Sequence, residues 1–400
     1  TLKSQVENEL DGDGNPTETA INGASFTHEA VADELTNIDN ERAVDGGANI
    51  NGKTITITDA VGIDDASTLR DELVANHQNS SFIYLNVEDT ATRLADNDDT
   101  DSGDDDIDGK TITISGATDL TQLDTIRTRA GDGNVTHTEV EDTYEALESR
   151  AASAIADLNG KTVTATTGGT LDELATLKTQ VENVLDDDGV TPTNDAIGDG
   201  VATFTHEAVA DELTNIDNER GVNGGANING KEITITDAVG INDAITLRDE
   251  LELNHQNDTF TYQFVEDSAT ALTSDDPNTD SGADDIEGKT VTISGSTNLA
   301  DLAEIRSRVG SNDLVTYTTV GDDYENLSDE ASDKAGADYA NIEGYVVTID
   351  DAVGIDNAEA LEVIVTTDSD GNVLEGASLT YNNIEDTADR LDDSDTGTGE

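Results

Sequence analysis

Six short stretches of the chain alternate polar and hydrophobic residues with a period of two. They read KTITIT, KTITIS, KTVTAT, KEITIT, KTVTIS and YVVTID, directly after Gly52, Gly109, Gly160, Gly230, Gly288 and Gly344. Alternation rich in β-branched residues is typical of a strand with one buried face. An Asn, Asp or Glu precedes each glycine, and such a pair predicts a turn with a positive φ.

A second motif occurs seven times and ends in aspartate. It reads aromatic or aliphatic, any residue, Tyr or His, two residues, Val or Ile, any residue, Asp, beginning at Phe26, Phe82, Val135, Phe204, Phe260, Val315 and Leu379 and ending at Asp33, Asp89, Asp142, Asp211, Asp267, Asp322 and Asp386. We expect a second strand here, followed by a short helix. The aspartate would be the N-cap of that short helix, because a carboxylate accepts from the unpaired N–H groups of a first turn.

A longer helix is predicted between the two strands. Hydrophobic residues keep helical spacing at Ile63, Ala66, Leu69 and Leu73, and again at Leu171, Leu174, Leu177, Val181 and Leu185. One unit is therefore strand, helix, strand, short helix. Strands that alternate with helices pair in parallel, so the sequence predicts an α/β protein.

The units belong to a tandem array. THEAVADELTNIDNER at Thr27–Arg42 recurs unchanged at Thr205–Arg220, an offset of 178 residues. We divide the chain into a partial repeat and six full repeats, with a super-repeat of about 178 residues that relates 1–159 to 176–343. The predicted domains are 1–51 (partial), 52–108, 109–159, 160–229, 230–287, 288–343 and 344–400.

Two architectures fit such an array. A unit this small buries little surface alone, so stacking in a solenoid, or as closely packed small α/β domains, would complete the core. The long acidic connector at Ala95–Gly109 instead favours a string of separate domains. We expect the solenoid or the closely stacked arrangement.

The composition narrows the classes of partner. The chain has 400 residues, 89 of them acidic and 19 basic, for a formal charge of −70. This charge argues against nucleic acids and anionic membrane surfaces as partners. No cysteine is present, which excludes disulfides and thiolate sites, and no apolar run is long enough to cross a membrane.

The ends of the sequence carry a separate expectation. The chain lacks an initiating Met and a signal-like apolar segment. We expect a processed product or an excerpt whose native polypeptide continues beyond both ends, or whose neighbouring subunits supply missing strands.

No constellation of catalytic residues occurs in the sequence, and we expect no enzyme and no bound organic cofactor. His28, His137 and His206 occupy a motif position that holds Tyr in the other copies, which favours packing over proton transfer. His77 and His255 stand near predicted helix ends, where a cation suits the helix dipole.

Two acidic loops are candidate calcium sites. Their oxygen-bearing residues alternate around glycine, as hard-cation ligands do, at Asp11, Asp13 and Asn15 and at Asp368, Asp370 and Asn372. Ordinary Asp-Gly turns explain the same pattern equally well. A further acidic loop, Asp186–Gly189, has the same character.

Two weaker sequence patterns are further candidates for functional sites. Thr-x-Thr pairs on one strand face, such as Thr111/Thr113, resemble ice-binding solenoids, but threonine is also favoured on exposed strands. Four N-glycosylation sequons occur, at Asn79, Asn134, Asn257 and Asn326, and chance accounts for them in a chain rich in Asn and Thr.

The phrases VEDTATRLA and VEDTYEAL, which start at Val87 and Val140 after ITIT-type strands, resemble repeat regions of large secreted surface proteins. RTX-type adhesins and S-layer-like proteins share this style, and the resemblance implies an extracellular location at the cell surface. The nonapeptide calcium repeat of RTX proteins is absent. The acidity and the low count of eight lysines also resemble haloarchaeal, salt-adapted proteins.

We therefore expect an extracellular structural protein of a filament, surface layer or adhesin stalk. It would act mechanically, by stacking and by self-association once cations screen its charge. The alternative is a cation-dependent adhesin module that binds glycan or mineral through its acidic face. A salt-adapted enzyme ranks third.

Overall fold

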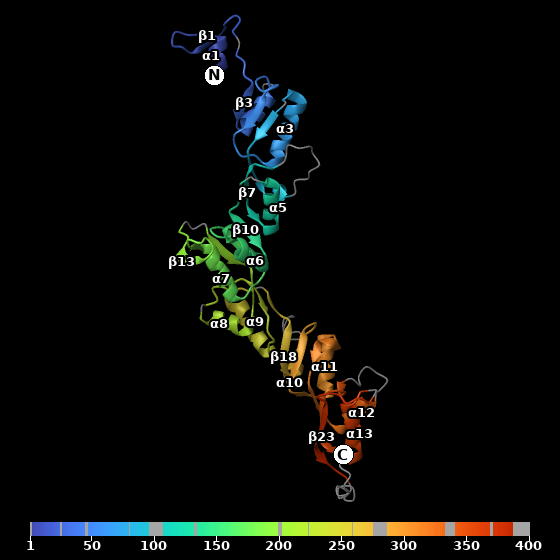
Figure 1. The fold of residues 1–400 in the computed structure, drawn as a ribbon. Helices are drawn as coiled ribbons and strands as arrows, with labels where there is room; N and C mark the ends of the chain where they lie inside the picture. Colours follow the sequence, from blue (N-terminus) through green and yellow to red (C-terminus); the bar gives the residue numbers. More distant parts are fainter. Residues whose placement is uncertain are drawn as a thin grey trace. The chain divides into compact units, whose positions relative to one another are not determined.

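The chain is a mixed α/β protein built from many small parallel sheets and short helices (Figure 1). The computed structural model describes residues 2–24, 26–44, 47–79, 81–95, 107–131, 134–198, 202–222, 224–257, 259–274, 286–332, 341–368 and 371–386. The α/β class predicted from the sequence is thus confirmed.

The chain divides into two units, and the division runs through one helix and one strand. The first unit comprises Thr1–Thr166 and Ala175–Thr205, and the second comprises Thr167–Leu174 and His206–Glu400. The elements up to this division are α1 (Leu2–Glu7), β1 (Asn8–Leu10), β2 (Pro16–Ala20), β3 (Ala30–Asp33), α2 (Leu35–Val44), β4 (Thr54–Ile57), α3 (Ile63–His77), β5 (Ser81–Tyr84), β6 (Asn86–Thr90), α4 (Ala91–Ala95), β7 (Thr111–Ser115), β8 (Ala117–Thr118), α5 (Leu120–Ala130), β9 (Val135–Thr136), β10 (Glu139–Asp142), α6 (Tyr144–Ala154), the 3-10 helix η1 (Ile155–Asp157), β11 (Thr162–Ala165), α7 (Leu171–Glu182), β12 (Asn183–Leu185), β13 (Pro192–Ala196) and β14 (Thr203–His206).

From β15 to α13 the second unit follows the order of elements from β3 to α7, except for the position of the 3-10 helix. It holds β15 (Ala208–Asp211), α8 (Leu213–Val222), β16 (Glu232–Ile235), α9 (Ile241–His255), β17 (Phe260–Tyr262), β18 (Phe264–Ser268), α10 (Ala269–Ser274), β19 (Thr290–Ser294), β20 (Ser296–Thr297), α11 (Leu299–Val309), the 3-10 helix η2 (Asn312–Leu314), β21 (Val315–Thr316), β22 (Thr319–Asp322), α12 (Tyr324–Ser332), β23 (Val346–Val353), α13 (Ile355–Thr366) and β24 (Ser378–Ile384).

Each alternating stretch forms the middle strand of a parallel sheet. β4 lies between β3 and β5, with Thr56 opposite Ala32 on one side and Ile83 on the other. β7, β16 and β19 lie between parallel neighbours in the same way. The predicted parallel pairing is confirmed for these sheets.

The second motif was expected to form one strand, and this is wrong for most copies. It breaks near its centre, so that its first half ends one sheet and its second half begins the next. Leu85, for example, separates β5 from β6. The break arises because the two halves pair with different neighbours: β5 with β4, and β6 with β7. β24 is the copy that stays unbroken.

Main-chain pairing links successive sheets within each unit. A bridge between Val61 and Val87 joins the segment after β4 to β6, and Val239 bridges Val265 in the same way. Elsewhere the middle strand bends at a glycine with positive φ and continues into a short strand, as at Gly116 between β7 and β8. β8 then pairs with β10, and β20 pairs with β22.

The core of a repeat lies between the helices and one face of the sheet. Ile55 and Ile57 of β4 are buried, as are Leu69 and Leu73 of α3. The threonines that alternate with these isoleucines are half-buried or exposed on the other face. The two-residue period of the sequence therefore separates a helix-covered face from a threonine-rich face.

Two antiparallel hairpins, β1–β2 and β12–β13, interrupt the parallel pattern. The helix expected to extend to Leu185 ends at Glu182, and Leu185 belongs to β12. None of the helices in the described ranges combines the length and apolar character needed to cross a membrane.

Candidate functional site

Six of the seven aspartates of the motif lie at the carboxyl ends of parallel strands, beside the first turns of the long helices. The Oδ2 atom of Asp89 accepts a hydrogen bond from the backbone N–H of Ile63, the first residue of α3, at 3.0 Å. The same contact joins Asp142 to Leu120 (2.9 Å), Asp211 to Leu171 (2.9 Å), Asp267 to Ile241 (3.1 Å), Asp322 to Leu299 (3.0 Å) and Asp386 to Ile355 (3.1 Å).

The expected capping is present, but the expectation named the wrong helix. The Asp caps the long helix that precedes its strand, because pairing between Val61 and Val87 brings the end of β6 beside the start of α3. The following residue, Thr90, Thr143 or Ser268, accepts from the first turn of the short helix. For α2, α8 and α12 an aspartate of the next strand segment accepts from the first amide: Asp59, Asp237 and Asp351.

The turn glycine holds the other end of the same helix. Gly52 has φ 68°, which side chains disfavour, and its N–H donates to the carbonyl of His77 at the end of α3 (2.8 Å). Gly109, Gly160, Gly230, Gly288 and Gly344 also have positive φ and donate to the carbonyls of Ala130, Val181, His255, Val309 and Val365. The recurring glycine and aspartate therefore fix the two ends of each long helix.

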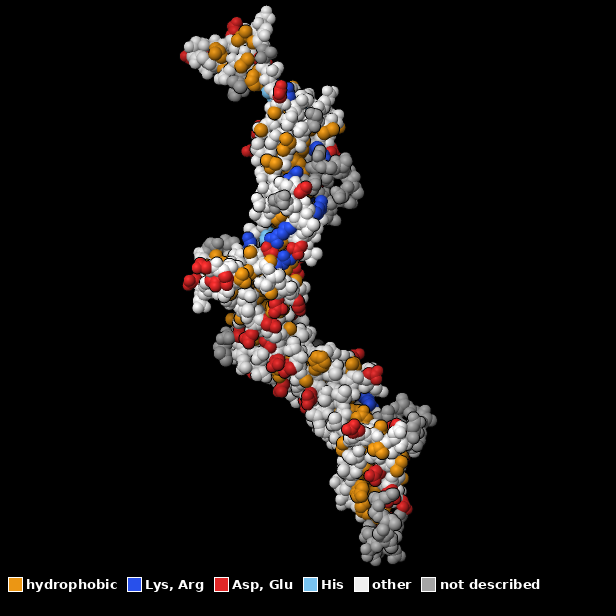
Figure 2. Space-filling view, viewed as in Figure 1, with side chains coloured by type: hydrophobic (Ala, Val, Ile, Leu, Met, Phe, Trp, Pro, Cys, Tyr) orange, Lys and Arg blue, Asp and Glu red, His pale blue; other side chains and the backbone are white. Residues whose placement is uncertain are grey.

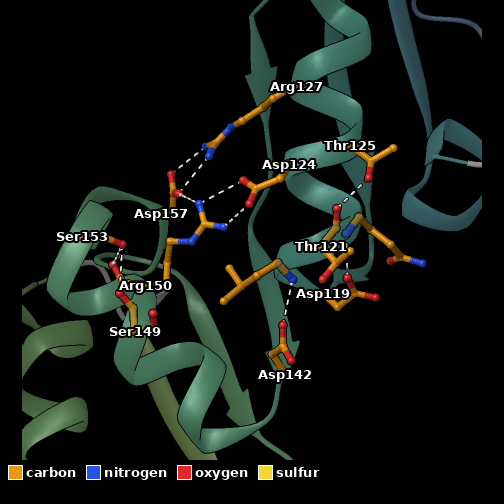
Figure 3. Close-up of polar contacts among 12 residues, drawn as sticks. Asp119, Thr121, Asp124, Thr125, Arg127, Asp142, Ser149, Arg150, Ser153 and Asp157 are labelled. Carbon is orange, nitrogen blue, oxygen red and sulfur yellow. Dashed lines mark hydrogen bonds and ion pairs between the residues drawn. The ribbon is translucent and has the colours of Figure 1, made fainter.

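A network of four charged side chains joins α5 to α6 and η1 in the first unit (Figure 3). Asp157, 7 % exposed, accepts from Arg127 at 2.6 and 2.8 Å and from Arg150 at 3.0 Å. Arg150 also donates to both carboxylate oxygens of Asp124, at 3.0 and 2.5 Å. Figure 3 shows Arg150 lying between the two carboxylates.

The network shifts the pKa values of Asp157, Arg127 and Arg150. Burial alone would raise the pKa of Asp157, but the hydrogen bonds and positive charges of Arg127 and Arg150 hold that pKa below its usual value. The hydrogen bonds that Arg127 donates to Asp157 raise the pKa of Arg127, and those that Arg150 donates to Asp124 raise the pKa of Arg150. These are structural ion pairs, because every charge has a partner within the network.

Three of the four charged residues of this network are replaced at the matching positions of the second unit. Asn341 replaces Asp157, Glu330 replaces Arg150 and Ala303 replaces Asp124, while the arginine is kept as Arg306. Arg306 donates to Asn341 and lies over the ring of Tyr317, and Asn341 donates to Glu330 at 2.7 Å.

The same region holds an acidic hollow of about 960 Å³. Its carboxylates are Asp301, Asp322, Asp323, Asp329, Glu330 and Asp350. Five of the six stand where the first super-repeat has an uncharged or basic residue: Gln122, Thr143, Ser149, Arg150 and Thr166. Acidic side chains also recur over the face drawn in Figure 2, where basic ones are few.

A glycine keeps this hollow open. Gly321 stands where the first super-repeat has Glu141, and a Cβ at Gly321 would lie 2.9 Å from Ser296 Oγ and 3.2 Å from Asp350 Oδ2. The hollow suits a cationic group chemically, since its charged lining residues are all carboxylates. Sequence reasoning missed it because its members come from three separate segments.

The candidate calcium loops form tight turns. Asp11 Oδ1 accepts from the N–H groups of Asp13 (2.9 Å) and Asn15 (2.8 Å). Asp368 accepts from the backbone and side chain of Asn372, at 2.8 and 2.9 Å, whereas Asp370 lies outside the described residues. No group of three or more metal-ligating His, Cys, Asp or Glu side chains occurs within the described residues. Calcium binding at these loops stays a prediction.

The third acidic loop places two carboxylates together. Asp186 and Asp188 share a hydrogen bond, which raises the pKa of Asp186 and, with the N–H groups of Val190 and Thr191, lowers the pKa of Asp188. Both groups are exposed, and the loop is the turn of the β12–β13 hairpin.

The His or Tyr side chain at the shared position of the second motif donates a hydrogen bond to a loop carbonyl. His137 Nε2 donates to the carbonyl of Asp157 at 2.8 Å, and Tyr317, its counterpart, donates to the carbonyl of Asn341 at 3.1 Å. His28 donates to the carbonyl of Asn49 at 2.7 Å. The ring position therefore has a packing and hydrogen-bonding role in these copies.

The sequons divide into two pairs. Asn79 and Asn257 are 3 % and 4 % exposed, and the Nδ2 of each donates to two backbone carbonyls. Asn134 and Asn326 are exposed. A glycan on Asn79 or Asn257 is therefore incompatible with this fold.

The exposed threonines pair across neighbouring strands. Their hydroxyls lie within hydrogen-bond distance at Thr113/Thr136 (3.3 Å), Thr164/Thr205 (3.1 Å), Thr234/Thr261 (3.0 Å), Thr292/Thr316 (3.0 Å) and Thr348/Thr380 (2.9 Å). Such cross-strand pairs stabilise the sheet, and each leaves less hydrogen-bonding capacity for a ligand.

Comparison of the chain with protein-family models, with curated proteins and with solved structures finds no match. The resemblance to secreted surface proteins accordingly remains an expectation from the sequence.

Proposed function

We propose that this chain is an extracellular structural repeat protein that builds a filament, surface layer or adhesin stalk. Its repeats would continue as a solenoid, or as closely stacked α/β domains, and neighbouring polypeptides would extend the array by self-association. Such a protein acts mechanically and requires no catalytic centre.

The observation that carries this proposal is the reuse of one set of hydrogen bonds. The contact from a strand aspartate to the first amide of a long helix occurs at six places, and the contact from a turn glycine to the end of the helix also occurs at six. An active site is normally carried once, whereas the most regular polar contacts here recur with the repeat.

The bridges between successive sheets give the proposal a mechanical basis. In a linear array, each repeat is stabilised by its immediate neighbours. The main-chain pairs at Val61/Val87 and Val239/Val265 are contacts of this kind, and a tensile load would be borne across them.

Charge sets the condition for assembly. A formal charge of −70 makes copies of the chain repel one another, and added salt shortens the range of this repulsion. We expect self-association to appear as salt or divalent cation is raised.

Sedimentation velocity on the full chain tests this function. The expected result is a shift from monomer to large species between about 0.01 M and 1 M salt, steeper at higher protein concentration. A single monomeric species at every salt, calcium and protein concentration would contradict it.

A second candidate function is a cation-dependent adhesin module. The acidic hollow around Asp322 and Asp350 favours it, because its lining gained five carboxylates relative to the matching positions in the first super-repeat. For an adhesin module, we expect saturable binding to a glycan or mineral surface, and we expect a chelator to abolish that binding. Replacing Asp323 and Asp350 by Thr, the residue at both matching positions, should abolish that binding and leave self-association intact.

A further inference from the structure

Five asparagines of the chain are followed directly by glycine: Asn22, Asn51, Asn159, Asn223 and Asn229. In an Asn-Gly pair the main-chain nitrogen of the glycine can attack the side-chain amide, because glycine has no side chain to hinder the approach. Asn223 lies outside the described residues. The other four pairs can be compared within one fold.

These four pairs form the same kind of turn. In each turn, the N–H of the residue after the glycine donates to the carbonyl of the residue before the asparagine: Ala24 to Ile21 (3.1 Å), Lys53 to Ile50 (3.1 Å), Lys161 to Leu158 (3.1 Å) and Lys231 to Ile228 (3.2 Å). The four glycines have positive φ, between 67° and 84°. The local backbone conformation therefore does not distinguish one pair from another.

Three of the four turns are fastened to the end of a long helix through the main chain. The N–H of Gly52 donates to the carbonyl of His77 at 2.8 Å. The N–H of Gly160 donates to Val181 (3.0 Å), and that of Gly230 donates to His255 (2.8 Å). The nitrogen that would attack the asparagine is thus held by a helix carbonyl at these turns.

The side chains of the same three asparagines are held as well. Asn51 Oδ1 lies 2.6 Å from Nδ1 of His77, and Asn229 Oδ1 lies 2.6 Å from Nδ1 of His255. Asn159 Nδ2 donates to two backbone carbonyls, at 2.7 and 2.8 Å. Both reacting groups are therefore engaged in other contacts at the fastened turns.

The turn at Asn22 makes neither contact. Among the described residues, the N–H of Gly23 and the side chain of Asn22 have no hydrogen-bond partner. Both residues are exposed, but so is Asn51, so exposure alone does not set Asn22 apart. The matching position in the second copy, Gly198, is also exposed, although a strand and a helix precede the hairpin there.

We propose that Asn22 is a self-modification site, at which the chain deamidates without an enzyme, and that the helix contacts protect the fastened Asn-Gly turns of the repeats. At Asn22, the nitrogen of Gly23 gives up its proton to water and attacks Cγ, so that a new N–C bond forms. The bond between Cγ and Nδ2 breaks, and this nitrogen takes up a proton and leaves as ammonia. Water then opens the five-membered imide at either of its carbonyls, which yields aspartate or isoaspartate. No oxidant or reductant takes part.

A fastened turn must open before it can react. The N–H of Gly52 is directed at the carbonyl of His77, so ring closure requires this hydrogen bond to break, and the helix then loses a contact at its end. The reaction proceeds only from the small population of locally opened molecules. The same protection applies to Asn159 and Asn229.

The two products differ in their effect on the chain. Aspartate adds one negative charge and leaves the length of the main chain unchanged. Isoaspartate routes the main chain through the side-chain carbons, which adds a methylene group between β2 and β3 when it forms at Asn22. At a fastened turn the same product would displace the glycine that holds the helix end, so the protection preserves the repeat.

Peptide mapping by mass spectrometry tests the proposal on the full chain, aged at mildly alkaline pH, with all four pairs measured in the same sample. In the folded chain we expect Asn22 to deamidate at least tenfold faster than Asn51, Asn159 and Asn229. In guanidinium chloride, where the helix contacts are absent, this difference should disappear.

Equal rates at the four sites in the folded chain would overturn the proposal. A faster rate at Asn22 that persists in guanidinium chloride would overturn it as well, because the neighbouring residues and not the fold would then be the cause.

A variant tests the side-chain contact separately. His77→Ala removes the partner of Asn51 Oδ1 and leaves the same contact between Asn229 and His255 as an internal control. We expect Asn51 to deamidate several-fold faster than Asn229 in the folded variant. Equal rates at these two sites would overturn the protective role of the histidine.

Discussion

At the scale of single residues, the repeated positions have identifiable structural roles. The turn glycine supplies a positive φ and an N–H for the end of a helix, and the motif aspartate accepts from the start of the same helix. The ring at the His or Tyr position donates to a loop carbonyl. The glycine, aspartate and ring positions that recur in the sequence therefore act by forming hydrogen bonds with backbone N–H and C=O groups.

Asn79 illustrates this role and gives a first prediction. Its Nδ2 donates to the carbonyls of Ile50 (2.6 Å) and Lys53 (2.8 Å), so Asn79→Ala leaves both acceptors without that donor. We expect a loss of about 1–3 kcal/mol in the free energy of unfolding, measured by urea denaturation. Asn134→Ala, at an exposed sequon, is the control and should change stability by less than about 0.5 kcal/mol. Equal effects of the two substitutions would contradict the assignment.

His137 gives a pH-dependent prediction. Burial lowers the pKa of His137 below its ordinary value of 6.5, with Lys161 and Arg127 acting in the same direction and the hydrogen bond to the carbonyl of Asp157 opposing them. The unfolded chain therefore takes up a proton first as the pH falls. The stability contributed by the neutral ring is complete above pH 6.5 and is lost as the pH drops from there toward the folded pKa.

The matched variant is His137→Tyr, the residue at the corresponding position 317. Denaturation of both chains from pH 7.5 to 5 should show a loss of stability in the wild type that is smaller in the variant. Identical pH profiles would mean that His137 does not titrate with folding.

At the scale of elements, each long helix is fixed by the strands on either side of it. The strand before a helix begins with the glycine that holds the end of the helix, and the strand after it ends with the aspartate that caps the start. Helix, turn and strand are thus joined by hydrogen bonds at both ends of the helix. Among the described residues, Asp211 of the second copy caps a helix in this way and Asp33, in an identical stretch of sequence, does not.

The identical stretches provide a matched comparison of this cap. Both aspartates accept from the next backbone N–H and from the side chain of an asparagine, Asn37 or Asn215. The Ala substitutions therefore differ mainly in the contact from Asp211 to the N–H of Leu171. We expect Asp211→Ala to lower the free energy of unfolding by about 0.5–2 kcal/mol more than Asp33→Ala. An equal loss would show that the helix cap has no stabilising effect.

The element scale also shows what sequence patterns could and could not predict. The two-residue period of Thr54–Ile57 and the Asn-Gly turn before it are local, and they correctly predicted a strand and a positive φ. The helix that Asp89 caps could not be predicted locally, because the contact depends on the register between β6 and the segment after β4. For the same reason the break at Leu85 was missed, since it reflects a change of pairing partner.

The candidate site shows the same limit. The carboxylates of the acidic hollow come from α11, from the end of β22 and the α12 that follows it, and from β23, and the hollow is also marked by the loss of a side chain at Gly321. A sequence comparison of the two super-repeats records the change from Glu141 to Gly321. The space that this change opens is visible only in the fold.

At the scale of the whole molecule, charge dominates the expected behaviour. With a formal charge of −70, repulsion extends over a Debye length of about 30 Å at 0.01 M salt and about 3 Å at 1 M. Each repeat is small and acidic, so we expect the proposed array to depend both on screening of the charge by salt and on contacts between neighbouring repeats.

Thermal unfolding in a salt series, with and without chelator at matched ionic strength, separates two effects of cations. We expect the Tm to rise with salt through screening. A fall in Tm on chelation that persists in high monovalent salt would locate specific calcium sites, with the loops at Asp11–Asn15 and Asp368–Asn372 as first candidates. A Tm that responds to neither treatment would contradict the electrostatic account.

The central claim is that the chain is a building block of an ordered assembly, and electron microscopy of that assembly tests it most directly. The full chain is imaged after transfer from low to high salt, with calcium present. The account predicts filaments or sheets with a regular repeat, which disperse when the salt is removed. Isolated particles at every condition, or amorphous aggregates without a repeat, would contradict it.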